Sequence, residues 1–418
     1  MPPKHAECKH VNICDDELKS GVTSLENVQA GVEEFHKNGI VIFENAIPHN
    51  IVEKFYEKMN TDGGQRLEDP NLVFNHGIEK NNFSLCPPLS KEWLTEDIWA
   101  NKHAAAVMEA VIGKPQLVHA GSNITIPTQE PTSRQAVHID SYHSHHRFPT
   151  CIELFMYLHD VSPENGSPEI WPGSHHDWNF RDLVSHGRGW IKSSAFNRRA
   201  EHSPPFQPTI PKGSIGIRDL RLWRSGMPNL SDQNCIMLGF TYFPRWYRNP
   251  MRITLPKTCR FLMQKWTQVD AIGATEFVDG EINHLDPNYD MLASLNFTQD
   301  PEKSIKQIRE KIDTAQGREL NAELTVTDRD YWVPGRKKLI ERVTHGEGQA
   351  NQGDRGKGRK RGKGKEMGKR NGRGQNDQNH TKAEGGFLKP KSEGVKKKAR
   401  KPRNKGPKGE SKVESKGE

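Results

Sequence analysis

The middle third of the chain consists of short β-rich runs separated by turn residues, and this pattern constrains the fold more than any other feature of the sequence. Four such runs lie at 117–126, 151–159, 214–217 and 236–243, with Gly, Pro, Asn and Asp between them. No helical pattern of about 10–15 residues separates the runs, although parallel strands need a crossover of that kind. The pattern therefore predicts an antiparallel sandwich or a jelly-roll barrel.

Segments with helical periodicity flank these runs and predict helices packed outside the sheet. A capping box at 23–26 opens the first helix, and Asn38-Gly39 ends it. Pro48 starts the second helix, and a third is expected over 100–113. The buried faces of the first two helices are predicted from residues at helical spacing: Val28, Val32 and Phe35, then Ile51, Val52, Phe55 and Met59. A short strand is expected at 40–43 and a later helix at 301–316.

Charge divides the chain into a body and a tail. Residues 346–418 hold 23 Lys and Arg against 9 Asp and Glu, a net charge of +14, whereas residues 1–345 carry −6. Phe387 is the only aromatic residue of the tail, so the tail has too little apolar surface to offset its ordering entropy. We predict a disordered basic tail at 346–418, a folded domain at 23–345 and a disordered N-terminus at 1–22. Basic clusters at 358–361 and 396–401 are typical of nuclear targeting or nonspecific binding to nucleic acid and other polyanions.

Several classes of protein are not expected. No apolar run approaches the roughly 18 residues of a membrane span, and the first residues contain no apolar signal segment. Six Cys in 418 residues do not suggest a disulfide framework. These features favour a reducing compartment, the cytoplasm or the nucleus. The oligomeric state does not follow from the sequence.

A His-x-Asp pair, His138-Ile139-Asp140, is the first candidate for chemistry. On a strand both side chains lie on one face, because side chains alternate with a period of two. An imidazole and a carboxylate in this arrangement can hold two corners of a metal, and a distant His would complete the facial triad of non-haem iron enzymes. Two surface polar residues are the alternative, and His284-Leu285-Asp286 has the same pattern.

The motifs around this pair carry a family resemblance. Their order along the chain is His138-Ile139-Asp140, 160–166, 172–175, 218–229 and 242–249. In this order they resemble the phytanoyl-CoA dioxygenase family of Fe(II)- and 2-oxoglutarate-dependent oxygenases, especially its fungal-type members, over roughly residues 24–250. The resemblance implies a mainly β fold with flanking helices around a double-stranded β-helix, or jelly-roll, core. It also implies Fe(II) and 2-oxoglutarate as cofactors, with His138 and Asp140 as metal ligands.

Two positions depart from the pattern that the resemblance implies. Arg224 stands where the family has its third iron ligand, a His, and Cys235 stands where the family has the Arg that holds 2-oxoglutarate. A guanidinium offers no lone pair to a metal, so the iron triad is degenerate. We therefore predict that Arg224 takes the metal position and pairs with Asp140. The alternative is that Arg224 points elsewhere and that iron binds His138 and Asp140 with waters.

Other residues near these motifs receive weaker assignments. Arg218 lies six residues before Arg224, and on one regular strand the two would share a face, which makes Arg218 the candidate for co-substrate binding. The alternative places such arginines outside the barrel. His143, His145 and His146 are expected to line a loop near the site, and His175 and His176 to be structural.

Three hypotheses about function follow from these motifs and from the basic tail. The first is an oxygenase that hydroxylates or desaturates a small metabolite, with secondary metabolites the substrates that the resemblance implies. The second is a catalytically inactive dioxygenase-fold binding protein with a polyanion-binding tail. The third is an oxygenase that its tail tethers to nucleic acid. No catalytic residue beyond the metal ligands is assigned.

Overall fold

The computed structural model describes residues 8–70, 72, 74–75, 81–129, 134–141, 147–177, 179–184, 189–247 and 251–286. All of them belong to one unit, residues 1–352. The predicted helix at 301–316, the predicted tail at 346–418 and the boundary between domain and tail lie outside the described residues, as do His143, His145 and His146.

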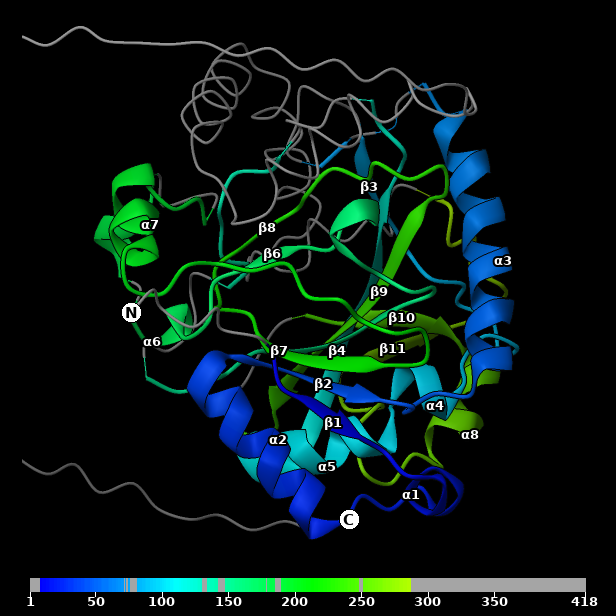
Figure 1. The fold of residues 1–418 in the computed structure, drawn as a ribbon. Coiled ribbons are helices and arrows are strands. Elements are labelled where there is room, and N and C mark those ends of the chain that lie inside the picture. The colour runs from blue at the N-terminus through cyan, green and yellow to red at the C-terminus, as the bar shows by residue number, and fades with distance from the viewer. Residues whose placement is uncertain are drawn as a thin grey trace, which may run out of the picture. The chain divides into compact units, whose positions relative to one another are not determined.

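A seven-stranded sheet forms the centre of the described part of the chain (Figure 1). Its spatial order is β1 (His10–Asn12), β2 (Ile40–Glu44), β7 (Ile215–Asp219), β5 (Ile152–Tyr157), β9 (Cys235–Pro244), β4 (Pro115–Thr125) and β3 (Asn82–Leu85). The four predicted runs all appear as strands of this sheet. Each neighbouring pair is antiparallel, as predicted, except β1 and β2, which run parallel.

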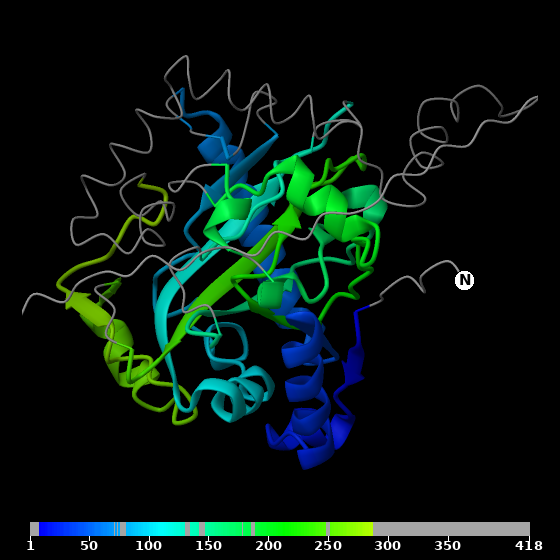
Figure 2. The same cartoon turned by 90° about the vertical axis from the view of Figure 1, so that its left-hand side faces the viewer.

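Helices cover one face of this sheet. They are α2 (Leu25–Asn38), α3 (His49–Leu67), α4 (Glu96–Trp99) and α5 (Lys102–Ile112). Leu154, Ile217 and Phe240 of the sheet lie in one apolar cluster with Phe35, Phe55 and Val107 of the helices. Figure 2 shows the strands of the sheet against α2 and α5. The sheet-dominated core with flanking helices that the sequence predicts is confirmed.

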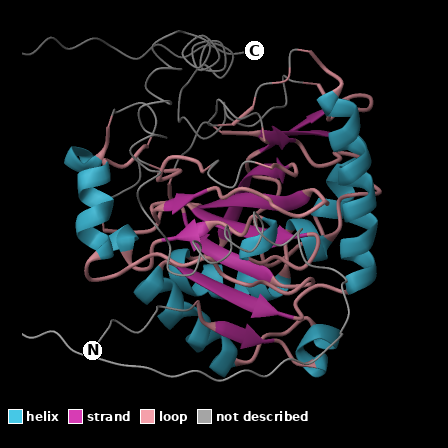
Figure 3. Ribbon diagram, turned by 45° about the horizontal axis from the view of Figure 1, so that its top comes forward, coloured by secondary structure: helices cyan, strands magenta, loops and turns pink. Residues whose placement is uncertain are grey.

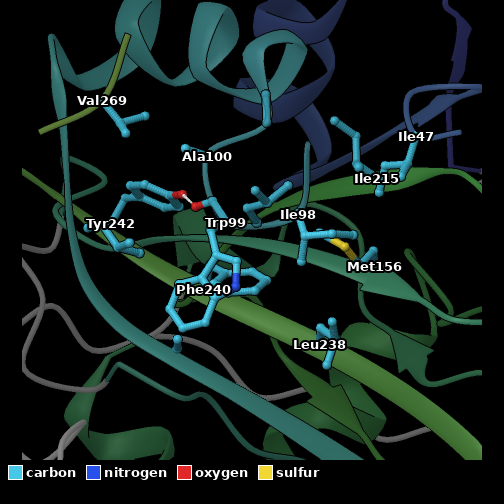
Figure 4. Packing of buried hydrophobic residues seen from close by; sticks show 14 of the residues in the cluster. Ile47, Ile98, Trp99, Ala100, Met156, Ile215, Leu238, Phe240, Tyr242 and Val269 are labelled. Carbon is cyan, nitrogen blue, oxygen red and sulfur yellow. Dashed lines mark hydrogen bonds between the residues drawn. The ribbon is translucent and has the colours of Figure 1, made fainter. Parts of the chain in front are cut away.

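Trp99 is a large, fully buried side chain of this cluster, and Figure 4 shows it beside Phe240. Its ring centroid lies 5.0 Å from that of Phe240, and the Tyr242 hydroxyl donates a hydrogen bond to the Trp99 carbonyl. Alternate residues of β9 therefore fix α4 onto the sheet. The other residues of β9 point to the opposite face, where the candidate site lies.

The ends of α2 follow the sequence signals, except that the N-terminal cap lies one residue later than the start of the predicted capping box. The side chain of Ser24, rather than Thr23, caps α2 by accepting from the Asn27 amide, and Gly39 ends the helix with φ +79°. Thr23 instead contacts the His103 ring, with 2.9 Å between Oγ1 and Nδ1.

The predicted disordered N-terminus at 1–22 is wrong from residue 8 onward. Residues 10–12 form β1, and α1 (Asp15–Ser20) follows. Val11 and Ile13 are buried in the main apolar cluster. The reason is that β1 adds a parallel strand to the edge of a sheet formed by residues far along the chain, which the polar local sequence does not reveal.

A smaller layer lies over the other face of the sheet. Its paired strands are β6 (Glu169–Ile170) and β8 (Arg224–Ser225), which run antiparallel. Single antiparallel bridges extend it, joining His138 to Trp190 and Arg224, and Ile170 to Phe206. Figure 1 shows β6 and β8 on one side of the sheet and α2 and α5 on the other. The candidate site lies between this layer and the sheet.

Shorter elements complete the described chain (Figure 3). They are η1 (Pro163–Asn165), α6 (Ser174–Asp177), η2 (Phe180–Asp182), α7 (Ser193–Ala200), β10 (Ile253–Pro256), η3 (Lys257–Cys259), α8 (Arg260–Met263) and β11 (Thr275–Val278). β10 and β11 pair in parallel. All six Cys are unbridged thiols. Among the described residues, no helix has the length and hydropathy needed to cross a bilayer.

Truncating Trp99 tests this account of the core. We expect Trp99→Ala to lower the free energy of unfolding by about 3–5 kcal/mol, because it leaves a cavity between α4 and β9. Urea denaturation measures the change. Phe261→Ala is the control, since Phe261 is 71% exposed and its loss should cost less than about 0.5 kcal/mol. Equal losses from the two substitutions would contradict the packing described here.

Candidate functional site

Backbone pairing brings positions 138, 140 and 224 to one place. His138 and Arg224 form an antiparallel bridge in which each backbone N–H donates to the carbonyl of the other, both at 2.9 Å. Directly opposite residues of such a pair project their side chains to the same face. Asp140 lies two residues after His138, and its amide donates to Leu220 O at 3.1 Å. The two residues of the predicted metal pair therefore face the side chain of Arg224.

Arg224 and Asp140 form a two-point ion pair. Arg224 Nε and Nη2 donate to Asp140 Oδ2 and Oδ1, each at 2.7 Å. This is the fork-to-fork geometry in which a guanidinium binds a carboxylate most strongly. Arg224 therefore pairs with Asp140 in this structure, as the sequence predicts.

Arg218 joins the same group from the main sheet. Its Nη2 donates to Asp140 Oδ2 at 3.2 Å and also to Glu153 Oε2. Glu153 on β5 is the direct antiparallel partner of Arg218 on β7. Arg218 and Arg224 thus lie close together, as expected, but they do not share one regular strand. β7 ends at Asp219 and β8 begins at Arg224, so the two arginines reach Asp140 from separate strands.

We call Asp140, Glu153, Arg218 and Arg224 the charge cluster. With both acids ionised, its four charges sum to zero. The side chains of Arg218, Asp140, Glu153 and Arg224 are 3%, 11%, 13% and 19% exposed. The cluster is enclosed by protein, yet solvent reaches the two acids and Arg224.

Burial and pairing shift the pKa values of the cluster in opposite directions. Burial alone would raise the pKa of Asp140, but the guanidiniums of Arg224 and Arg218 hold it well below its ordinary value. Burial raises the pKa of Glu153, and repulsion from Asp140 adds to this, although Arg218 opposes both. Burial would lower the pKa of Arg224, but Asp140 raises it above its ordinary value. Asp140 and Arg224 are therefore a fully ionised pair.

Glu153 is the member of the cluster that the sequence analysis missed. The available signal was a single carboxylate inside an otherwise apolar strand, Cys-Ile-Glu-Leu-Phe-Met-Tyr at 151–157. Phe155 and Tyr157 follow at even spacing and belong to an apolar cluster separate from that of Leu154 and Met156. This alternation assigns Glu153 to the face away from the helices.

His138 is oriented by its own backbone segment. Its Nδ1 lies 2.8 Å from the Ala136 carbonyl oxygen, so this nitrogen carries a proton and donates. The other ring nitrogen, Nε2, lies 3.7 Å from Asp140 Oδ1.

Cys235 does not supply a charge in place of the arginine that the resemblance implies. It is buried at the start of β9, in the apolar cluster of Phe155 and Tyr157. Burial raises the pKa of the Cys235 thiol to about 12, so the thiol stays neutral.

His175 and His176 have structural contacts. Both Nε2 atoms lie within hydrogen-bond distance of the His36 carbonyl oxygen, at 3.1 and 2.5 Å. The His175 ring packs against Gly39, where a Cβ would lie 2.7 Å from Nδ1. Burial lowers the pKa of His175 to about 4, which keeps this ring neutral.

Two further arginines of the motif regions, and the second His-x-Asp pair, form separate ion pairs. Arg221 binds Asp219, and Arg245 lies 3.2 Å from Asp270 at the surface. His284, from the second His-x-Asp pair, contacts Asp62 of α3 at 2.8 Å. In the parts of the chain that the structure describes, no group of three or more His, Cys, Asp or Glu side chains could hold a metal ion.

Comparison with known proteins gives a family match, and structures of the epimerase SnoN are among the solved structures that are similar. Residues 35–234 match the family model described as phytanoyl-CoA dioxygenase. One similar structure is the non-heme alpha ketoglutarate dependent epimerase SnoN from nogalamycin biosynthesis, at 16% identity and a TM-score of 0.38 over 53% of this chain and 82% of that chain. Another is SnoN in complex with Fe3+, alpha ketoglutarate and nogalamycin RO, at 17% identity and 0.40 over 53% and 84%.

Removing the guanidinium tests the energetic role of the ion pair. We expect Arg224→Ala to lower the free energy of unfolding by about 3 kcal/mol at neutral pH, because the buried Asp140 carboxylate loses both bonds of the fork. Asp140→Asn in the same background should recover most of this loss. Urea denaturation of the two single variants and the double variant measures the coupling.

The pH dependence of this loss has a defined sign. The pKa of Asp140 is lower in the folded state than in the unfolded chain, so the pair stabilises above about pH 4 and its contribution is lost as the pH falls further. A loss from Arg224→Ala that is undiminished when Asp140→Asn is also present would contradict this account.

Proposed function

This chain belongs to the phytanoyl-CoA dioxygenase family, and from that premise we propose that it is a member in which an internal ion pair replaces iron, so that it binds a small molecule without oxidising it. The single observation that carries the proposal is the two-point bond between Arg224 and Asp140. A metal at this place needs the oxygens of Asp140, and both of them accept from Arg224.

The residues present do not fit the iron that the family implies. His138 and Asp140 are two candidate donors, and the residue opposite His138 is an arginine, which has no lone pair for a metal. A cation bound at Asp140 would also lie against the fixed positive charges of Arg224 and Arg218. These residues therefore support no reaction step through iron.

The layers of the described chain support the finer fold assignment. A double-stranded β-helix has two facing sheets, and here a large sheet faces a smaller layer formed by β6, β8 and the bridges at His138. We propose that these are the two walls of such a β-helix. The charge cluster then lies between the walls, where members of the family are expected to bind their ligands.

One observation favours the alternative, an active oxygenase. Because Nδ1 of His138 donates to the Ala136 carbonyl, Nε2 is the ring nitrogen left for a metal, and it lies 3.7 Å from an oxygen of Asp140. In this reading Arg224 would swing away, water would complete the metal sphere, and Arg218 would hold 2-oxoglutarate. The substrate would be a small metabolite, such as a secondary metabolite.

Metal titration decides between the two functions. We expect Fe(II), Co(II) and Zn(II), added without oxygen, to leave the melting temperature of the wild-type chain unchanged. Arg224→His should gain saturable metal binding, because position 224 lies directly opposite His138. At a metal concentration of 100 times Kd, the gain is about 2.7 kcal/mol of stability.

Two matched variants sharpen this test. Arg224→Gln also removes the guanidinium but supplies no imidazole, and it should gain far less. Arg224→His combined with Cys235→Arg should bind 2-oxoglutarate in addition to metal. Wild-type turnover of 2-oxoglutarate that disappears in His138→Ala would refute the proposal in favour of the oxygenase.

We also propose that the basic segment 346–418 binds nucleic acid or another polyanion nonspecifically. Its support is the net charge of +14 in a segment with a single aromatic residue. Replacing all 23 Lys and Arg of the segment by Gln in the full chain should abolish binding to single-stranded RNA and remove its steep salt dependence. Filter binding at several salt concentrations measures both effects. Tight RNA binding that survives the replacement would assign the binding to the body instead.

A further inference from the structure

Arg218 is the most deeply buried member of the charge cluster, at 3% exposure of its side chain. It projects from β7 to the same side as Glu153, its antiparallel partner on β5. Its guanidinium carbon lies 5.7 Å from the centroid of the Phe155 ring. The position of the charge is thus fixed by the strand register and by an aromatic surface.

The hydrogen bonds of Arg218 leave a buried donor in need of an acceptor. One nitrogen, Nη2, donates to both Asp140 and Glu153. Nε is buried and has no hydrogen-bond partner among the residues that the structure describes. A buried donor left in this state costs about 1–3 kcal/mol, so an additional acceptor oxygen at Arg218 would be stabilised.

The two acids of the cluster are not equivalent. Both oxygens of Asp140 are held by Arg224, so Asp140 stays neutralised without Arg218. Glu153 bonds to Arg218 alone among the cluster's basic groups, and its side chain is 13% exposed. A Cβ at position 239 would lie 2.8 Å from Glu153 Oε1, so Glu153 lies directly against Gly239. Glu153 is therefore the acid that an external carboxylate can replace at the lowest cost.

We propose that Arg218 anchors a binding site for a small molecule that carries a carboxylate, and that Glu153 is the internal competitor which this carboxylate displaces. The proposal rests on the metal-free function above and names the ligand class of the same site. The ligand carboxylate accepts from Nε and a terminal nitrogen of Arg218, which together form a two-point donor. Glu153 accepts from Nη2 and leaves Nε unused. Displacement leaves the bond between Arg224 and Asp140 intact.

Calorimetry on the full chain tests the proposal with defined probes. Acetate, benzoate, succinate and 2-oxoglutarate are titrated in the presence of EDTA, with acetamide and benzamide as uncharged counterparts. We expect at least one carboxylate to bind saturably and the amides not to bind. Glu153→Gln should lower the Kd of that carboxylate at least tenfold, because it removes the competing charge while keeping the shape of the side chain.

Variants of Arg218 give the opposite result. Arg218→Gln should abolish binding, and Arg218→Lys, which keeps the charge but lacks the Nε donor, should raise Kd at least tenfold. The Lys variant serves if the Gln variant fails to fold. Glu276→Gln, at an exposed position of β11, removes the same charge elsewhere and should leave Kd unchanged.

Three outcomes would overturn the inference: no saturable carboxylate binding in either wild type or Glu153→Gln, equal or weaker binding in Glu153→Gln, or binding that survives in both Arg218 variants. These outcomes differ from failure of the metal-free function, which is measured by metal titration without any carboxylate. A chain that binds iron and not carboxylates in EDTA would refute both.

Discussion

The bond between Arg224 and Asp140 is the interaction on which the site depends. It uses both oxygens of the only carboxylate in the His-x-Asp pair, so every other use of Asp140 must first break it. Breaking it exposes a carboxylate that burial would otherwise force to take up a proton. The pair therefore fixes the charge state of the site and limits the cations that it can accept.

The two layers of the fold make this bond available. β5 and β7 carry Glu153 and Arg218 from the main sheet, while the bridge between His138 and Arg224 belongs to the smaller layer. The charge cluster thus crosses from one layer to the other. The helices pack on the opposite face of the sheet and contribute no member of the cluster, so the core and the site occupy separate faces of the same strands.

The sequence predicted most of the main sheet and helices because their signals are local. The helices at 25–38 and 102–112 begin at capping residues and the helix at 49–67 follows Pro48, while the strands lie between clear turn residues. β1 was missed because its stabilisation comes from pairing with β2, which lies beyond the whole of α2 in the chain. The pairing of Arg224 with Asp140 was predicted from the family resemblance, which puts Arg224 at the position of the third iron ligand, together with the opposite charges of the two side chains.

Glu153 could not be assigned in the same way. Its role depends on the register between β5 and β7, which places it opposite Arg218. Register is set by packing across the whole sheet rather than by residues near Glu153. Likewise, Arg221 lies three residues before Arg224 and would have been an equally good partner by charge, yet it binds Asp219 two residues away. Local hydrogen-bond geometry, which the sequence does not reveal, separates these arginines.

The place of β9 in the sheet has a practical consequence for anyone who works with a fragment of this protein. The family match ends at residue 234, one residue before β9 begins, and it starts inside α2. β9 lies between β5 and β4, so a polypeptide trimmed to the matched range would lack an interior strand. Two half-sheets with unpaired backbone edges would remain, which is a surface that drives aggregation. Expression trials should therefore keep the chain intact through at least the end of β11.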